Sequence, residues 1–338
     1  MTPPRLSVCI PNLDMERYVG GAIRSALAQS EPDLEVVVLD NASADGSPEA
    51  IRAAAAGDPR VRSFRNPRTL PMARNWNECL ARARGTWFVL LSADDELHPD
   101  FAARCLALAR RFPELGYVFT HTTTLDADGR ETASPPFYEA SAILPGLEEA
   151  RLNLVGSHNG PSEMLIHRER FLALGGYDPG YAWAHDMHAK LRLSLHHDVG
   201  YLDEPLCRYR VHARNSTARI HRSKLGVMEI YRLKLELLES LPPRARPLAE
   251  CREGMLENLA RLCERFASGA RAEGEPRLAL EYEHLARAFA PARRATAAPG
   301  PAGPPFPLPP GSRRLDPAAF LPGPRGAAPG SGGLAAIR

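Results

Sequence analysis

Short hydrophobic runs alternate with segments of helical periodicity over the first hundred residues. The runs that read as strands are RLSVCIP (5–11), LEVVVLD (34–40), VRSFRN (61–66) and TWFVLLSADD (86–95). Between the first two, Val19, Ile23 and Leu27 recur at helical spacing. Strands that are apolar at nearly every position are typical of parallel sheets buried on both faces. The pattern therefore predicts an α/β fold, with a mostly parallel, Rossmann-like sheet flanked by helices.

Beyond residue 116 the pattern changes twice. GYVFTHTTTLDADGRE predicts a strand pair, PSEMLIHRERFLALGG a strand and a helix, AHDMHAKLRLSLHH a helix, and DVGYLDEPLCRYRVH an alternating strand with a turn at 203–205. From about residue 223 the periodicity is helical throughout, whereas 291–338 is rich in Pro, Gly, Ala and Arg. We expect a sheet domain at 1–220, a helical C-terminal extension at 221–290 and a disordered tail at 291–338.

Polar residues follow three of the predicted strands, at 11–14, 40–46 and 94–95. The carboxyl ends of parallel strands share one edge of a sheet, and ligands bind beyond that edge. We therefore expect these residues to face one cleft. Asp94 and Asp95 are neighbours, and two like charges repel each other, so the pair predicts a cationic partner. The alternative interpretation is that both acids only favour the start of the helix at 99–100.

Composition removes several classes of function. Lys and Arg total 42 against 40 acidic residues, for a net charge of +2, which argues against a dedicated nucleic-acid binder. The six cysteines are scattered without metal-type spacing, so we expect buried thiols. Neither a leader sequence nor an apolar run of about 20 residues is evident, which favours a cytoplasmic chain. Peripheral association with the inner face of a membrane is not indicated but stays open.

The ordered set SVCIPNLDMERYVGG, EVVVLDNASADGS, ARNWNECLARARGTWFVLLSADD, GGYDPGYAWAHD and YLDEPLCRYRVH resembles a family 2 glycosyltransferase of the GT-A fold. The resemblance covers about residues 6–216. It implies an inverting enzyme that uses a nucleotide-diphospho-sugar donor and a divalent cation, Mg²⁺ or Mn²⁺. The acceptor would be a hydroxyl on a glycan, a lipid-linked sugar or a small molecule.

The resemblance also assigns residue roles. It implies that donor binding involves Pro11, Asn12 and Asp14 in the first loop, Asp40 and Asn41 after the second strand, Arg74 in ARN, and Asp94. It implies that Asp95, with Asp94 and His212, holds the metal, and that Asp186 is the catalytic base. The chemistry agrees, because a departing sugar diphosphate needs positive charge and a hydroxyl acceptor needs a base.

The sequence departs from the family pattern at Leu13, Ser92 and His185. His185 stands where an acid usually precedes the base; it would either lower the pKa of Asp186 or hydrogen-bond the acceptor. These departures keep a catalytically silent sugar-nucleotide-binding protein as the alternative. A nucleotidyltransferase lacks support because no glycine-rich basic loop follows the first strand, and a dehydrogenase because no GxGxxG follows a strand.

Acceptor choice is expected to depend on loops near 137–161 and 180–184. Trp183 would either stack on an acceptor sugar or belong to the core. The C-terminal helices would provide a surface for homo-oligomer formation, for covering the site or for membrane contact, and the sequence does not distinguish these roles.

Overall fold

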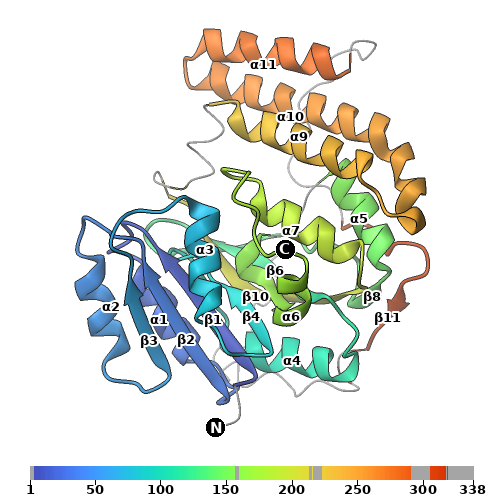
Figure 1. Ribbon diagram of the computed structural model, residues 1–338. Helices are drawn as coiled ribbons and strands as arrows, with labels where there is room; N and C mark the ends of the chain where they lie inside the picture. Colours follow the sequence, from blue (N-terminus) through green and yellow to red (C-terminus); the bar gives the residue numbers. More distant parts are fainter. Residues whose placement is uncertain are drawn as a thin grey trace, which may run out of the picture.

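The computed structural model describes residues 4–156, 160–212, 215, 223–290, 305–316 and 318 of the 338-residue chain. A mixed sheet with helices on both faces forms the larger part of the molecule, and three long helices stack at one end of it (Figure 1). Within the described residues, no helix combines the length and the apolar composition needed to cross a bilayer.

The sheet contains eleven strands among the described residues. They are β1 (Leu6–Asn12), β2 (Leu34–Asp40), β3 (Val61–Arg65), β4 (Trp87–Leu90), β5 (Glu96–Leu97), β6 (Tyr117–Leu125), β7 (Glu131–Ala133), β8 (Ala142–Leu144), β9 (Met164–His167), β10 (Val199–Arg210) and β11 (Arg313–Arg314). Their main order is β11-β8-β10-β6-β9-β4-β1-β2-β3, with β5 paired to β10 and β7 paired to β6.

The four strands β3, β2, β1 and β4 pair in parallel, as the sequence predicts. Strand β9 runs antiparallel between β4 and β6, and β8 and β11 add further antiparallel pairings, so the sheet as a whole is mixed. In the register of β1 and β2, Asn12 lies opposite Asp40. The chain after β4 continues beside β1, because the Leu91 amide donates to the Cys9 carbonyl at 2.9 Å. The expected shared edge is confirmed.

Helices cover both faces of the sheet and form the extension. They are α1 (Val19–Leu27), α2 (Ser47–Ala55), α3 (Met72–Ala81), α4 (Phe101–Arg111), α5 (Gly146–Val155), α6 (Arg168–Ala173), α7 (His185–Ser194), α9 (Leu225–Glu239), α10 (Arg252–Ala272) and α11 (Pro276–Phe289). Two 3-10 segments, η1 (Pro161–Glu163) and η2 (Pro243–Cys251), complete them.

Three hydrophobic cores hold these layers together. Alternate residues of β1 and β2 face opposite ways: Val8 and Val36 pack with α1 and α4, whereas Cys9 and Val37 pack with α3, α6 and α7. A third core joins α5 and α7 to α9, α10 and α11. All six cysteines are free and buried, which confirms the expectation from their spacing.

Several local predictions differ from the structure. The region 137–161, expected as a loop, contains β8 and α5. The expected turn at 203–205 is an irregularity within one continuous strand, β10, whose pairing with β6 shifts there.

The tail expected to be disordered from residue 291 is ordered at 305–316. Arg313 and Arg314 pair with β8, and the Phe306 amide donates to the Phe137 carbonyl at 2.8 Å. This segment is ordered because its backbone pairs with a free edge of the sheet, and amino-acid composition alone does not predict such pairing. Most of the remaining tail, and the expected boundary at 220, lie outside the described residues.

A glycine two residues before β4 tests how tightly the chain is packed beside the sheet. A Cβ on Gly85 would lie 2.6 Å from the Ser7 amide nitrogen and 2.7 Å from the Trp87 carbonyl oxygen. Because backbone cannot yield as a flexible side chain does, Gly85→Ala should lower the free energy of unfolding by about 1–3 kcal/mol. Chemical denaturation would measure the loss. Gly254→Ala in α10, whose Cβ would meet only ordinary contacts, should be neutral or slightly stabilising; equal effects would contradict the prediction.

The junction between sheet and extension contains a buried cation, Lys234, whose ammonium donates to the Gly156 carbonyl at 2.7 Å. Burial lowers the Lys234 pKa from 10.5 to about 7. The unfolded chain thus binds a proton more tightly than the folded chain between pH 7 and 10.5, so the native state carries a penalty that is complete below pH 7 and disappears toward pH 10.5.

Replacing this amine should reveal that penalty. Lys234→Met should stabilise the protein at pH 6.5, on the order of 2 kcal/mol after the lost hydrogen bond, and by much less at pH 9.5. Thermal unfolding at the two pH values would measure the difference. A gain independent of pH would show that the amine titrates normally in the folded chain.

Candidate functional site

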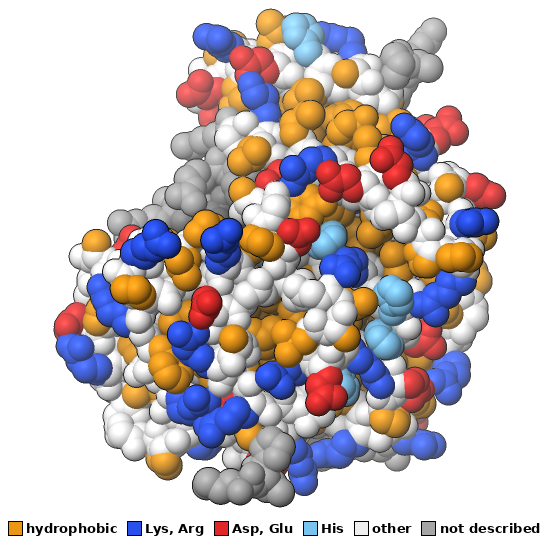
Figure 2. Space-filling view, in the orientation of Figure 1, with side chains coloured by type: hydrophobic (Ala, Val, Ile, Leu, Met, Phe, Trp, Pro, Cys, Tyr) orange, Lys and Arg blue, Asp and Glu red, His pale blue; other side chains and the backbone are white. Residues whose placement is uncertain are grey.

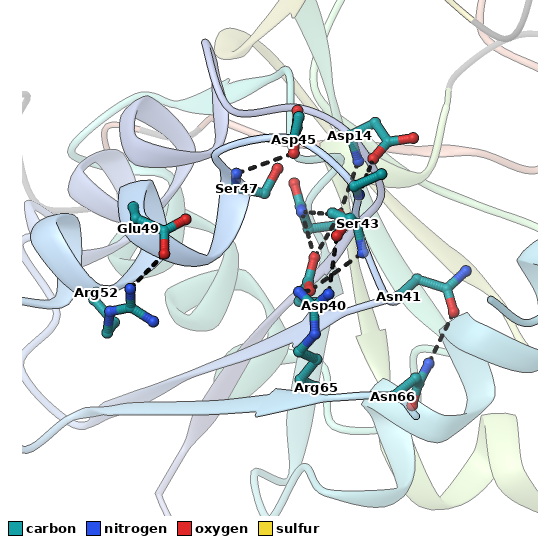
Figure 3. A network of polar contacts seen from close by, with 12 residues as sticks. Asp14, Asp40, Asn41, Ser43, Asp45, Ser47, Glu49, Arg52, Arg65 and Asn66 are labelled. Carbon is teal, nitrogen blue, oxygen red and sulfur yellow. Dashed lines mark hydrogen bonds and ion pairs between the residues drawn. The ribbon is translucent and has the colours of Figure 1, made fainter. Parts of the chain in front are cut away.

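Loops from the ends of β1 and β2 are joined by a polar network (Figure 3). The Asn12 amide donates to an Asp40 oxygen at 3.0 Å and to the Ser43 hydroxyl at 3.1 Å. The Asp14 backbone amide donates to the same hydroxyl at 2.9 Å, and the Asp14 carboxylate accepts from the Ala44 amide at 2.8 Å. Asp14 adopts a φ of 53°, which Asp tolerates better than most residues. The two loops therefore form one unit.

Asp40 is the centre of this network. It is almost completely buried. Its carboxylate accepts hydrogen bonds from Asn12 and Ser43 and forms an ion pair with Arg65 on β3. Arg65 also donates to the Ser43 carbonyl at 2.9 Å. The carboxylate thus stabilises the loop after β2 from beneath.

Asn41 connects the same edge to the segment before α3. Its side-chain amide donates to the Leu70 carbonyl and its oxygen accepts from the Leu70 amide, both at 2.9 Å. Asn66 donates to that oxygen and also to Asn75 in α3, again at 2.9 Å. Both ends of the Asn41 amide are therefore engaged within the protein.

Arg74 and Pro11 lie in contrasting environments. Pro11 is buried within β1, next to Asn12. Arg74 is exposed in the first turn of α3, one residue before the inward-facing Asn75. Arg74, one of the residues expected to bind a donor, therefore places a positive charge in solvent beside the loops that follow β1 and β2.

The Asp94–Asp95 pair lies where the chain leaves β4. Asp95 is 2% exposed; one of its oxygens accepts from the Arg210 amide at 2.9 Å and the other from the Ser162 hydroxyl at 2.7 Å. Burial, followed by the charge of Asp94, raises the pKa of Asp95 to about 7. The pair is thus a concentration of negative charge that a cation would stabilise.

His212 lies against the first carboxylate of this pair. Its Nε2 is 3.0 Å from an Asp94 oxygen, and its ring packs on Tyr18 with centroids 4.8 Å apart. His212, 118 residues after Asp94, is therefore brought to the acidic pair.

Arg210 braces this place from β10. Its Nε donates to the Asp94 carbonyl at 2.9 Å, and its guanidinium pairs with Glu96 at 2.7 Å and contacts the Asp126 carbonyl at 3.2 Å. The guanidinium also lies 5.0 Å from the centre of the Tyr18 ring. The position of the acidic pair is thus set by both halves of the sheet.

The acidic pair and His212 do not make up a complete metal site. Within the described ranges, no group of three or more His, Cys, Asp or Glu side chains is arranged to hold a metal. One or two carboxylates agree with an ion that takes most of its ligands from phosphate and water, as Mg²⁺ does beside nucleotides.

Asp186 lies in the first turn of α7, where the helix dipole favours negative charge. It is partly exposed. One turn later, the buried Lys190 acts electrostatically on both Asp186 and Glu163 of η1. Burial, with a smaller contribution from the charge of Asp95, raises the pKa of Glu163 to about 8. A run of buried ionisable groups thus links the α7 end of the site to Asp95.

His185 does not face the site. Its side chain is completely buried and packs edge-on against Trp76 of α3, with centroids 4.4 Å apart, and against Tyr177. Burial lowers its pKa, so the ring is neutral at pH 7. Neither of the roles expected for His185, a cation beside Asp186 or a contact to the acceptor, agrees with this position.

Sequence reasoning missed Ser162, Glu163, Lys190 and Arg210. Ser162 and Arg210 reach the acidic pair from 67 and 115 residues away. In β10, Arg208 and Arg210 share one side of the alternation, so no pattern distinguishes the buried Arg210 from the half-buried Arg208.

Comparison with known proteins agrees with the fold. The sequence model of Glycosyl transferase family 2 matches residues 7–172. Residues 7–172 therefore form a domain of that family. The family 2 domain contains every element of the acidic edge up to η1, whereas Asp186, Arg210 and His212 lie beyond the matched region.

Relatives and solved structures extend the comparison. Succinoglycan biosynthesis protein ExoO of Rhizobium meliloti is 41% identical over 157 residues, which is 45% of this chain and 44% of that protein. The structure of S. aureus TarS 1-349 in complex with UDP-GlcNAc matches with a TM-score of 0.56 at 12% identity, over 84% of this chain and 92% of that one. Mannosyltransferase PcManGT from Pyrobaculum calidifontis, in complex with GDP-Man and Mn²⁺, matches at 0.56 and 19% identity, over 86% and 82%.

The brace formed by Arg210 can be tested against its neighbour on the strand. Arg210→Met keeps the apolar stem but leaves Glu96 and two carbonyls without their cationic donor, so it should lower the free energy of unfolding by about 1.5–3 kcal/mol. Arg208→Met, which removes an ion pair to the more exposed Glu131, should cost less than about 1 kcal/mol. Denaturant unfolding would compare the two, and equal losses would contradict a bracing role.

Proposed function

We propose that the chain is an inverting glycosyltransferase that moves a sugar from a nucleotide-diphospho-sugar to an acceptor hydroxyl. The observation that carries the proposal is the Asp94–Asp95 pair, in which Asp95 is buried, next to His212 at the edge where β1 and β2 also end. Membership of residues 7–172 in family 2 and the nucleotide sugars bound by the structural neighbours support it.

The donor would lie on the frame built by the first two loops. Pro11, Asn12, Asp40 and Asn41 are buried, and the side chains of the last three form hydrogen bonds within the protein, so we assign them to shaping the nucleotide site. Asp14 lies at the surface of the same frame, and the exposed guanidinium of Arg74 would pair with phosphate. A rigid frame lowers the entropy lost when a donor binds.

Asp94, Asp95 and His212 would hold the divalent cation. When bound, Mg²⁺ or Mn²⁺ would offset the negative charge that develops on the diphosphate as the sugar departs. The Mn²⁺ in the PcManGT complex supports this choice of cofactor.

Asp186 would act as the general base. The acceptor hydroxyl gives its proton to the Asp186 carboxylate while its oxygen bonds to the sugar C1, and the C1–O bond to the diphosphate breaks on the opposite face. The products are a glycoside of inverted configuration and a nucleoside diphosphate. Asp186 lies in the first turn of α7, at the end of the helix that favours negative charge.

A hydrolysis screen of nucleotide sugars with and without Mn²⁺ tests the proposal. We expect turnover of one donor that is abolished by a chelator and reduced about 100-fold or more by Asp95→Ala. Asp33→Asn, a change at an exposed acid at the opposite end of β2, is the matched control and should retain activity. Donor cleavage unaffected by chelator and by Asp95→Ala would leave the metal assignment without support.

The role of Asp186 as the base can be tested separately from donor binding. Asp186→Asn should lower the rate of sugar transfer by about 10²–10⁴-fold while the affinity for the donor found in the screen, measured by calorimetry, stays within a few-fold. A wild-type chain that binds a donor without turning it over would instead establish the catalytically silent alternative. Equal losses of donor affinity and of rate would place Asp186 in donor binding.

A further inference from the structure

A cavity of about 570 Å³ lies between the sheet domain and the helical extension. Its walls come from α5, α7, α9 and α10, with Phe306 of the ordered tail segment at its border. In Figure 1 these helices meet above the sheet, and in Figure 2 hydrophobic side chains interrupt the charged surface over the extension. The volume falls within the range of about 300–1,000 Å³ that is usual for small-molecule sites.

The lining is apolar except at a few points. Hydrophobic side chains are contributed by every wall, among them Leu152, Met187, Ile230 and Leu262. The polar groups are Asn258, Lys234 and Arg265, and none of the described lining residues is acidic. This combination fits an apolar chain or ring that carries an oxygen-rich or anionic group, and it disfavours a cationic ligand.

The cavity adjoins the candidate catalytic end of α7. Trp183, three residues before Asp186, and Met187, directly after it, both line the cavity. On another wall, Gly156 follows the end of α5. The cavity is therefore lined by residues on both sides of Asp186 in the sequence.

We infer that this cavity binds the apolar part of the acceptor, and hence that the acceptor is an amphipathic molecule. The inference rests on the proposed transferase function. The acceptor hydroxyl would lie at Asp186, its apolar chain or ring would fill the space between α7 and α10, and its polar or anionic group would lie near Lys234 and Arg265. Trp183 then forms part of the acceptor wall.

Paired alkyl glycosides test the inference. With the donor from the hydrolysis screen, transfer to methyl and decyl β-glycosides of glucose, galactose and N-acetylglucosamine is compared. The decyl member should have a kcat/KM at least tenfold above that of its methyl partner. A tenfold gain corresponds to burial of only about two methylene groups, well within the capacity of the cavity.

Two substitutions locate the chain-length preference. Leu262→Trp in α10 adds bulk inside the cavity, and Val155→Phe does so from α5. Each should reduce the decyl-to-methyl ratio toward one, and this ratio does not depend on the fraction of folded protein. Leu256→Trp is the matched control, because Leu256 is half-buried on the same helix and does not line the cavity, so its ratio should match the wild type.

A binding measurement separates failure of the inference from failure of the proposed function. The apolar anion 1-anilinonaphthalene-8-sulfonate should bind the wild type and Leu256→Trp, and at least tenfold more weakly Leu262→Trp. Donor turnover with equal use of methyl and decyl acceptors would overturn the inference and leave the transferase intact. Absence of any turnover would reject the proposed function, and with it the acceptor role, even if the dye binds.

Discussion

The arrangement of this molecule depends on one constraint. The acidic pair Asp94–Asp95 follows β4, and the Asp95 carboxyl is kept away from water. The chain leaves β4 through Asp94 and Asp95, crosses to β10, and pairs with it as β5. Along the main order of the sheet, β9 and β6 separate β4 from β10. Hydrogen bonds from Arg210 and Ser162 hold the two acids where the parallel half of the sheet meets the mixed half. Each hydrogen bond that offsets the charge therefore also fixes the joint between the two halves.

The donor side of the edge is stiff for a related reason. Asp40 and Asn41 each satisfy their polar atoms inside the protein, through Arg65, Ser43 and the backbone of Leu70. Buried polar groups without partners would be costly, so these contacts permit few alternative loop conformations. The family resemblance implied direct contact with the donor, but the geometry indicates that much of their contribution is to fix the loops that would contact it.

The sequence predicts best what is local. The alternation of β1, α1, β2, α2, β3, α3 and β4 follows from apolar runs and helical spacing, and from it the shared edge follows by topology. It predicts poorly what depends on distant partners. Strand β11 forms because β8 offers a free edge, and α5 has a weak amphipathic pattern because both the sheet side and the extension side cover it. Lys190 and Glu163 likewise interact only because the fold brings α7 and η1 together.

Helix α7 explains why the extension belongs to the active region. Ala189 and Leu193 pack into the core beneath the sheet, whereas Met187, Leu191 and Leu195 pack into the core shared with α9 and α10. Both sets recur every four residues, so they form two stripes on different sides of the helix. Asp186 lies in the first turn of this helix, so its backbone is held in place by both cores. The extension thus helps to hold the helix that carries the proposed base, and the cavity on its inner side is lined by the neighbouring Trp183 and Met187.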